Sequence, residues 1–250
     1  MKCSEIMEVI RETFPEDKAL SWDHVGLLCG EEDQEVSKIL VAVDVTEEIV
    51  ESAVVKGCDM IISHHPMIFS PLYSVNAKDH TGRKLLKLIR NNICCFAMHT
   101  NYDTVRMAKL AGELLGLSDM EELCEDGIGV IGNLKDTAAG LCEKVKHTFG
   151  LSQVIFYGNT STRIDKVAIV PGSGKSTIRE ALSKGAQVLI TGDIGHHDGL
   201  DAKEMGLSII DAGHYGVEQI FVKDMGEYLA EKVPGVEVLE EAVRIPYSII

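Results

Sequence analysis

Short apolar runs alternate with segments of helical periodicity along much of the chain. Residues 39–43 form an apolar run that predicts a buried strand, and residues 47–56 carry apolar side chains at helical spacing. Thr46 and Gly57 flank this helix as its expected N-cap and C-cap. A second apolar run, at 60–62, follows directly. This order of strand, helix and strand is typical of α/β proteins with parallel strands.

The second half of the chain repeats this pattern. Residues 167–170 and 188–190 predict strands, with a Gly-rich turn at 171–174 and a helix over about 176–184 between them. The sequence KGCDMIIS of the first half matches KGAQVLIT of the second. Each half continues with a further helix and a further apolar strand. Any two strand–helix–strand units look alike, but polar residues follow the corresponding strands in both halves, which favours duplication.

We therefore predict an α/β fold of two similar, pseudo-symmetric halves with mixed sheets. The first half is expected at 1–117, with part of the C-terminal segment packing on it. Residues 118–165 are expected to link the halves, and residues 166–250 are expected to form the second half. A chain of 250 residues is long enough for one large or two small domains of this class.

Two adjacent histidines, His64 and His65, follow the apolar run at 60–62. Packing a strand does not require imidazole rings at its end, whereas neutral imidazole is a common metal ligand. The carboxyl ends of parallel strands are also where α/β folds build their sites. Further candidate ligands follow other expected strands, and two of them are spaced to share one face of a helix. These candidates are Asp103, His214 and Glu218.

Three imidazoles and two carboxylates exceed the three protein ligands that are usual for one catalytic zinc ion. A two-metal site with one bridging carboxylate accounts for the surplus and leaves positions open for water. We therefore predict a dinuclear metal site between the two halves. Nitrogen and carboxylate ligands suit zinc, iron or manganese, and the sequence does not distinguish among these metals. The isolated His24, His80 and His147 are expected to be ordinary hydrogen-bonded residues.

Other polar residues near the expected strand ends are candidates for supporting roles. Asp193 occupies, in the second half, the position that His65 has in the first, and is expected to accept a proton from a ligand imidazole. His99, His196 and His197 are expected to transfer protons or to orient the ligands. The sequence GSGKS at 172–176 resembles the end of a phosphate-binding loop without its first glycine, so we expect a tight turn there.

The net charge of −15 argues against a general nucleic-acid-binding protein, because affinity for phosphate backbones comes largely from clustered Lys and Arg. Arg83, Lys84, Lys87 and Arg90 lie in one stretch and are expected to form an ordinary solvated helix face. Seven cysteines without disulfide or zinc-finger spacing predict reduced thiols and a cytoplasmic protein. The sequence shows no signal peptide and no apolar run of membrane-spanning length.

A set of motifs in this order resembles the GTP cyclohydrolase 1 type 2 homologue family, also called the NIF-three-like family. The motifs are WDHVGL at 22–27, DVT at 44–46, SHHP at 63–66, HTNYD at 99–103, TGDIGHH at 191–197 and GHYGVE at 213–218. The resemblance implies two metal ions held by His64, His65, Asp103, His214 and Glu218, with Glu218 as the bridging carboxylate. It also implies a toroidal homohexamer whose sites face an internal cavity. Longer members carry an inserted middle domain, which is not expected in this chain.

The chain departs from the family pattern at two positions. His24 stands where Asn is usual, and Lys175 lies in a Gly-rich turn that usually has no lysine. The favoured function is metal-dependent hydrolysis of a small molecule, which the resemblance implies is a nucleotide or a related heterocycle. The rival is a non-catalytic metal-binding ring that acts as an interaction or nucleic-acid-binding module. Binding that weakens steeply with added salt would favour nucleic acid.

Overall fold

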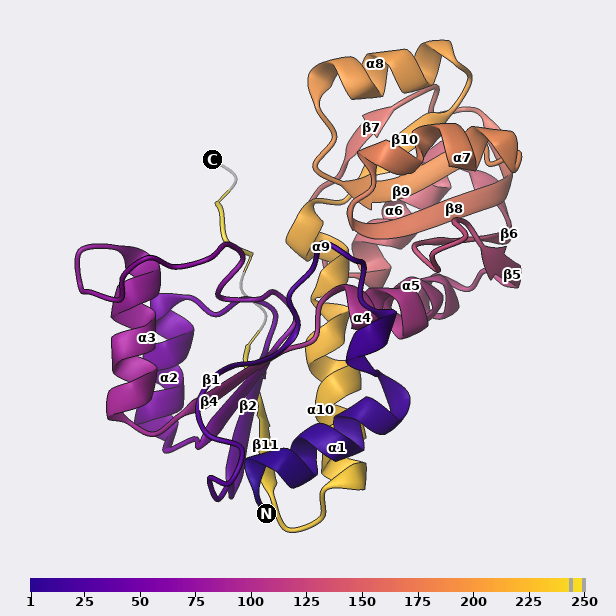
Figure 1. Cartoon of the computed structure of the whole chain (residues 1–250). Coiled ribbons are helices and arrows are strands. Elements are labelled where there is room, and N and C mark those ends of the chain that lie inside the picture. The colour runs from indigo at the N-terminus through magenta and orange to yellow at the C-terminus, as the bar shows by residue number, and fades with distance from the viewer. Residues whose placement is uncertain (243–244, 249–250) are drawn as a thin grey trace. The chain divides into compact units, whose positions relative to one another are not determined.

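The computed structural model describes residues 1–242 and 245–248. The chain divides into two compact units, one formed by Met1–Tyr102 with Phe221–Val243 and the other by Asp103–Ile220 with Arg244–Ile250. Each unit is built on one mixed β-sheet with helices packed against it (Figure 1). The predicted α/β class with two mixed sheets is therefore confirmed. None of the helices in the described residues is both long and apolar enough to span a membrane.

The sheet of the first unit has the strand order β1–β4–β3–β2–β11. Its strands are β1 (Gly26–Cys29), β2 (Lys38–Ala42), β3 (Met60–Ser63), β4 (Cys94–Ala97) and β11 (Glu237–Glu240). All pairs are parallel except β1 with β4. In the register of the sheet, Ala42 pairs with Ser63, which in turn pairs with Ala97. The chain therefore leaves β2, β3 and β4 at one edge of the sheet, and the residues that follow these strands gather there.

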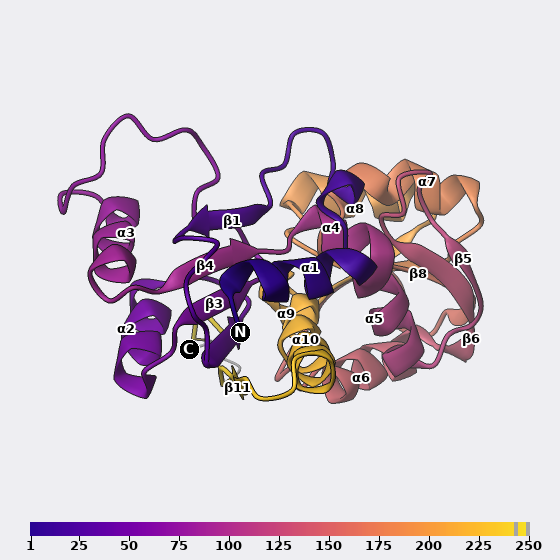
Figure 2. The same ribbon diagram turned by 60° about the horizontal axis from the view of Figure 1, so that its bottom comes forward.

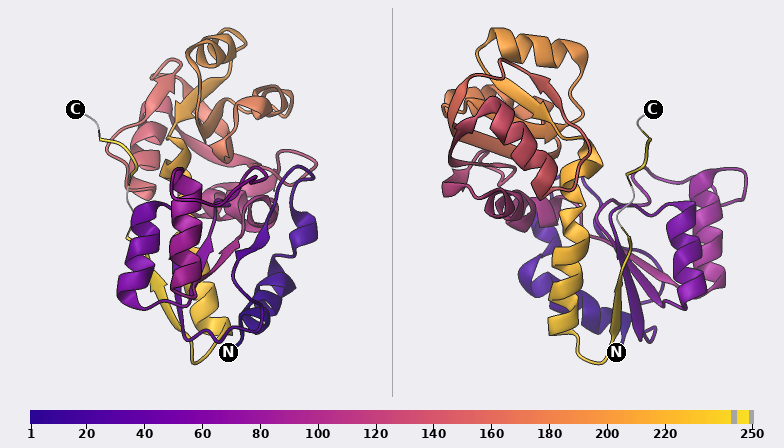
Figure 3. Two further views of the ribbon diagram at one scale, coloured as in Figure 1. Left: turned by 60° about the vertical axis from the view of Figure 1, so that its left-hand side comes forward. Right: turned by 180° about the vertical axis from the view of Figure 1, so that it is seen from behind.

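Helices cover both faces of this sheet. They are α1 (Cys3–Thr13), α2 (Glu47–Lys56), α3 (His80–Arg90), α4 (Thr100–Tyr102) and α10 (Ile220–Lys232), with the 3₁₀ helix η1 (Glu16–Lys18). Helices α2 and α3 lie side by side on one face, and α1 and α10 lie on the other (Figures 1 and 3). Leu40, Ile61 and Cys95 of adjacent strands share one buried cluster with residues of α2 and α3. Strand β11 brings the C-terminal segment back into the first sheet beside β2.

Helix α2 forms where the apolar spacing predicts it, because both of its ends are capped. The Thr46 hydroxyl accepts a hydrogen bond from the Ile49 backbone N–H at 3.2 Å. Gly57 ends the helix in the left-handed conformation, at φ +66°, which glycine adopts without a steric penalty. These caps fix where the chain leaves β2 and where it enters β3, which leads into His64 and His65.

The sheet of the second unit has the order β5–β6–β8–β9–β10–β7. Its strands are β5 (Ser118–Glu122), β6 (Val130–Thr137), β7 (Ile155–Tyr157), β8 (Arg163–Ser173), β9 (Val188–Gly192) and β10 (Ser208–Asp211). Strands β8, β9 and β10 are parallel, whereas β5, β6 and β7 pair antiparallel to their neighbours. Thr191 pairs with Asp211, so β9 and β10 end at the same edge.

Helices lie on both faces of the second sheet (Figure 2), and a cluster of buried apolar residues packs on each face. The helical segments of this unit are the π-helix η2 (Asp103–Met107), α5 (Ala108–Leu115), α6 (Ala138–Thr148), η3 (Lys175–Thr177), α7 (Ile178–Ser183), α8 (His196–Glu204) and α9 (His214–Glu218). Ile169 and Ile190 pack in one cluster with residues of α5 and α6, while Ala168 and Leu189 pack in the other with residues of α7 and α8. Alternate strand residues thus face opposite layers, as the period of two requires.

The two units share one order of elements. The series α1-β1-β2-α2-β3-α3-β4 of the first unit corresponds to α6-β7-β8-α7-β9-α8-β10 of the second. In both, the three parallel strands are neighbours in chain order, and the antiparallel strand pairs with the last of them. This common topology supports the predicted duplication.

The structure corrects two predictions about the middle of the chain. Residues 118–165 are not a link, because they supply β5, β6, α6 and β7 to the second unit. Strand β6 pairs with β8 along most of its length, and its apolar residues Val130 and Ile131 are buried in the layers of that sheet. The Gly-rich stretch 171–174 is mostly strand, because β8 continues to Ser173 with a shift of register relative to β9.

Candidate metal centre

In the first unit, His64 and His65 follow β3 directly and are fixed by backbone hydrogen bonds. The N–H of His64 donates to the Ala42 carbonyl at 3.1 Å, and that of His65 donates to the Val43 carbonyl at 2.9 Å. These bonds continue the parallel pairing of β3 with β2 past the end of the strand. The His64 side chain is fully buried, and its ring lies 5.3 Å from that of Phe221 on α10, centroid to centroid.

Both rings have Nδ1 beside an oxygen acceptor, which leaves Nε2 as the potential ligand atom. His64 Nδ1 lies 2.9 Å from the Met98 carbonyl oxygen, and because a carbonyl only accepts, Nδ1 carries the proton. His65 Nδ1 lies 2.8 Å from Asp44 Oδ1 in the same way. In each neutral ring the lone pair is then on Nε2. Metal-binding histidines usually donate the N–H of their other ring nitrogen to an acceptor of this kind.

His99 joins this cluster in the first unit. Potential ligand atoms of His64, His65 and His99 all lie within 4.8 Å of one another. His99 Nδ1 lies 3.0 Å from Asp23 Oδ2, and the same carboxylate oxygen accepts hydrogen bonds from the Thr100 backbone and hydroxyl at 3.0 and 2.6 Å. Burial by itself raises the pKa of Asp23, but these hydrogen bonds outweigh it and hold the pKa well below its usual range. Asp23 is therefore an anion that fixes His99.

In the second unit, His214 and Glu218 occupy the ends of α9 and face each other across one helical turn. His214 Nε2 lies 3.2 Å from Glu218 Oε2, and the Glu218 side chain is almost fully buried. His214 Nδ1 lies 2.7 Å from Asp193 Oδ2, so this ring has the same kind of acceptor behind it as His65. The predicted helical spacing of His214 and Glu218 is confirmed. Asp193 thus lies beside the imidazole of His214, as expected for a residue that accepts a proton from a ligand ring.

Two glycines make room for this pair. A side chain on Gly172 would collide with Glu218 Oε1, and one on Gly192 would collide with the backbone of His214. Gly172 also has φ +70°, which strains other residues. Thr191 fixes this segment, because its hydroxyl donates to the Gly172 carbonyl at 3.2 Å and accepts from the Gly174 N–H at 2.8 Å. The Gly-rich stretch thus allows the backbone at Gly172 to lie close to the Glu218 carboxylate.

Asp193 itself adopts an unusual backbone conformation. Its φ is +57°, in the left-handed region that residues other than glycine seldom occupy. Its neighbour Ile194 is fixed by a backbone hydrogen bond to Asp211 Oδ2 at 3.1 Å, and Asp211 Oδ1 accepts from the Gly213 N–H at 2.9 Å. The loops after β9 and β10 are therefore tied together, which sets the position of Asp193 behind His214.

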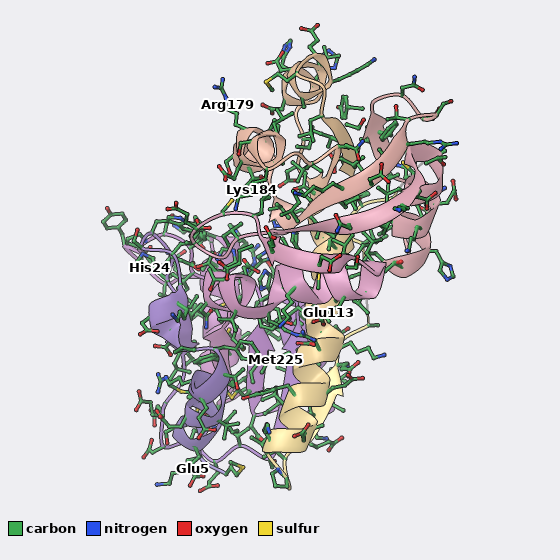
Figure 4. The ribbon with its side chains drawn as sticks, turned by 90° about the vertical axis from the view of Figure 1, so that its right-hand side faces the viewer. Glu5, His24, Glu113, Arg179, Lys184 and Met225 are labelled. Carbon is green, nitrogen blue, oxygen red and sulfur yellow. The ribbon has the colours of Figure 1, made fainter. Side chains whose placement is uncertain are left out.

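The remaining candidates all begin helical segments. Asp103 is the first residue of the π-helix η2, a helix type often found at functional sites, and its Oδ1 atom is buried. His196 and His197 begin α8, are exposed, and have ring centroids 5.3 Å apart. His24, labelled in Figure 4, is exposed, as are His80 and His147.

Two exposed aromatic side chains flank His99, and this feature was not predicted. Trp22 and Phe69 are 53% and 60% exposed, although their ring centroids lie 6.0 Å apart. They lie 5.9 and 6.5 Å from the His99 ring. Large apolar rings are usually buried, so an exposed pair beside a cluster of histidines provides a surface on which a planar group can stack. Trp22 is the only tryptophan in the sequence.

The sequence matches the Duf34/NIF3 (NGG1p interacting factor 3) family over residues 1–246. The chain belongs to this family. It is 36% identical over 247 residues to "GTP cyclohydrolase 1 type 2 homolog" of Lactococcus lactis, with 96% of each chain covered. It is 34% identical over 226 residues to "GTP cyclohydrolase 1 type 2" of Helicobacter pylori strain J99, with 90% of each covered. A Bacillus cereus protein related to NIF3 has the same fold, with a TM-score of 0.95 at 24% identity, covering 100% of this chain and 99% of the other.

Proposed function

We propose that this NIF3 family protein is a dinuclear metal-dependent hydrolase that acts on a nucleotide or a related heterocycle. The observation that carries the proposal is the common orientation of the histidines. His64, His65 and His214 each have Nδ1 at hydrogen-bond distance from a carbonyl or carboxylate oxygen, so each presents Nε2 as the potential ligand atom. The proposed metal ligands are His64, His65, Asp103, His214 and Glu218, with Glu218 as the bridging carboxylate.

The donor set fits zinc, iron or manganese. It consists of imidazole nitrogens and carboxylate oxygens, and the cysteines do not contribute to it. When bound, two such ions supply Lewis-acid activation of a water molecule and of the substrate atom that it attacks. The chain itself has to position its ligands and move the proton. Asp44 and Asp193 orient the rings of His65 and His214.

His99 is the residue that we propose as proton carrier, with His196 and His197 as further candidates. Its ring is held by the anionic Asp23 and lies among the potential ligand atoms of the first unit. A histidine beside a carboxylate is a common general acid or base. The exposed rings of Trp22 and Phe69 next to His99 support a planar substrate, because nucleobases stack on such side chains.

The names of the relatives support a nucleotide substrate, since several are called GTP cyclohydrolase 1 type 2 or its homolog. The rival proposal, a nucleic-acid-binding module, is less well supported. Of the basic cluster on α3, Arg83 pairs with Glu47 and Lys87 pairs with Glu51, so their charge is largely neutralised.

We also propose, from the family resemblance, that the protein forms a toroidal homohexamer in the cytoplasm. Its seven cysteines, all within the described residues, are free thiols, which suits a reducing compartment. Light scattering coupled to size-exclusion chromatography should give six times the mass of one chain. A monomer mass at micromolar concentration would contradict the hexamer but not the metal site.

The hydrolase proposal is tested by a turnover screen of nucleotides and phosphoesters with added zinc, iron or manganese. Wild type should convert at least one substrate, and His65→Ala should lose that activity because it removes a metal ligand. The exposed His147→Ala is the matched control and should keep full activity. Activity that persists in His65→Ala would assign the turnover to another site or to a contaminant.

A further inference from the structure

A cavity of about 350 Å³ opens beside His65 in the first unit. Its lining includes His65 and Asp44, and also Thr46, Met67, His80 and Lys84. Helices α2 and α3 both begin at this cavity, since Thr46 is the N-cap of α2 and His80 is the first residue of α3. The N-terminal ends of both helices carry partial positive charge, which favours anions nearby.

Lys84 is the residue that distinguishes this cavity. It lies one helical turn after His80, so both side chains are on one face of α3. Lys84 is half-buried rather than part of a solvated helix face, and its Nζ donates to the Val45 carbonyl at 2.7 Å. An ammonium group has three N–H donors, so this bond leaves two for a ligand.

Lys84 is the group in the cavity lining that can bind an anion, because the carboxylates of the lining are engaged by other residues. Both carboxylates that line it have cationic or hydrogen-bonding partners: Asp44 binds His65, and Glu47 accepts from Arg83 Nε and Nη2 at 2.9 and 2.7 Å. Lys84 has no carboxylate within ion-pair distance among the described residues. Burial lowers the pKa of Lys84, with partial opposition from Cys95, Glu47 and Asp44, and a bound anion would offset the cost of burying its charge.

We propose that this cavity binds an oxyanion of the substrate, a phosphate or a carboxylate, and that Lys84 is the residue that holds it next to His65. This assignment rests on the proposed function and adds the place where the oxyanion of such a substrate binds. Met67 and the stem of Lys84 provide the apolar wall against which the connecting atoms pack. Lys84 is a positioning residue, since it fixes the substrate relative to the metal ligands and does not itself take part in bond cleavage.

The test measures binding of inorganic phosphate to the full-length protein by isothermal titration calorimetry, with the metal content of each sample determined in parallel. Wild type should bind phosphate, and Lys84→Met should bind it roughly tenfold more weakly or worse, because a charge-assisted hydrogen bond is lost. Lys87→Met, on the same helix but paired with Glu51, is the matched control and should bind as wild type does. Lys84→Arg should retain most of the affinity.

Repeating the titration after chelator treatment separates this inference from the proposed function. Phosphate binding that survives metal removal and depends on Lys84 supports the subsite, even if no metal is found. Binding that vanishes with the metal and ignores Lys84→Met would overturn the subsite and leave the metal centre intact. An absence of binding to wild type at millimolar phosphate, or an equal loss in Lys87→Met, would also overturn it. Thermal unfolding of each variant shows whether Lys84→Met remains folded.

Discussion

At the scale of single residues, the candidate centre depends on acceptors behind the histidine rings. Asp44, Asp193 and the Met98 carbonyl each accept from one Nδ1 atom, and Asp23 lies within 3.0 Å of another. An imidazole that is fixed in this way does not have to be oriented or to change tautomer when a metal ion binds. The affinity for metal is therefore expected to depend on residues that do not contact the metal.

Replacing Asp44 with Ala should weaken metal binding about 10–100-fold, because His65 loses the acceptor that fixes its ring and its tautomer. Competition against a chelator of known affinity measures the change. Asp33→Ala, at an exposed turn, is the control and should leave the affinity unchanged. Unaltered affinity in Asp44→Ala would show that the carboxylate does not support the ligand.

The pH dependence of stability should report on Asp23. Hydrogen bonds lower its pKa in the folded protein below the ordinary value of 3.8, so its contribution is present above that value and is lost as pH falls toward the folded pKa. In metal-free protein, wild type should therefore lose more free energy of unfolding between pH 5 and pH 3 than Asp23→Asn does. Urea titrations at each pH measure this difference, and parallel curves for the two proteins would contradict it.

The sequence revealed these residues only in part. His64, His65, His214 and Glu218 could be predicted because they follow apolar runs or share a helical face. The proximity of His99 to His64 and His65 could not be predicted, because it depends on the strand register that pairs Ser63 with Ala97. The exposure of Trp22 and Phe69 could not be predicted either, because a single aromatic residue in a sequence does not indicate whether its side chain faces the core or the solvent.

At the scale of elements, the helix caps and the strand register place the site. Helix α2 was predicted with its observed bounds because Thr46 and Gly57 carry strong local signals. The strand structure at 171–173 was not predicted, because the glycines of this stretch are typical of a turn. In the structure they continue β8 and allow Gly172 to lie against Glu218. Local sequence signals therefore predicted helix ends better than they predicted a glycine that is required by a distant side chain.

Thr46→Ala should lower the free energy of unfolding by about 1 kcal/mol, because the Ile49 N–H loses its side-chain acceptor at the start of α2. Thr46→Ser keeps a hydroxyl at the cap and should stay close to wild type. Urea unfolding followed by circular dichroism gives both values. A Ser variant as unstable as the Ala variant would assign the loss to the missing methyl group and not to the cap.

At the scale of the whole molecule, duplication is the feature that the sequence predicts well and domain boundaries are the feature that it predicts poorly. The repeated strand–helix–strand pattern is visible in the alternation of apolar runs. The boundaries at Tyr102 and Ile220 fall inside helical segments, and the first unit takes its last strand from the far end of the chain. No local change of composition marks such an exchange, so residues 118–165 were mistaken for a link.

The most direct test of the central claim is the metal content of protein purified without chelator, measured by inductively coupled plasma mass spectrometry. Wild type should contain close to two transition-metal ions per chain. Glu218→Ala should lose most of this metal while keeping its circular dichroism spectrum, whereas Glu227→Ala, exposed on α10, should keep both ions. A wild-type content near zero, or full metal retention in Glu218→Ala, would contradict the dinuclear centre.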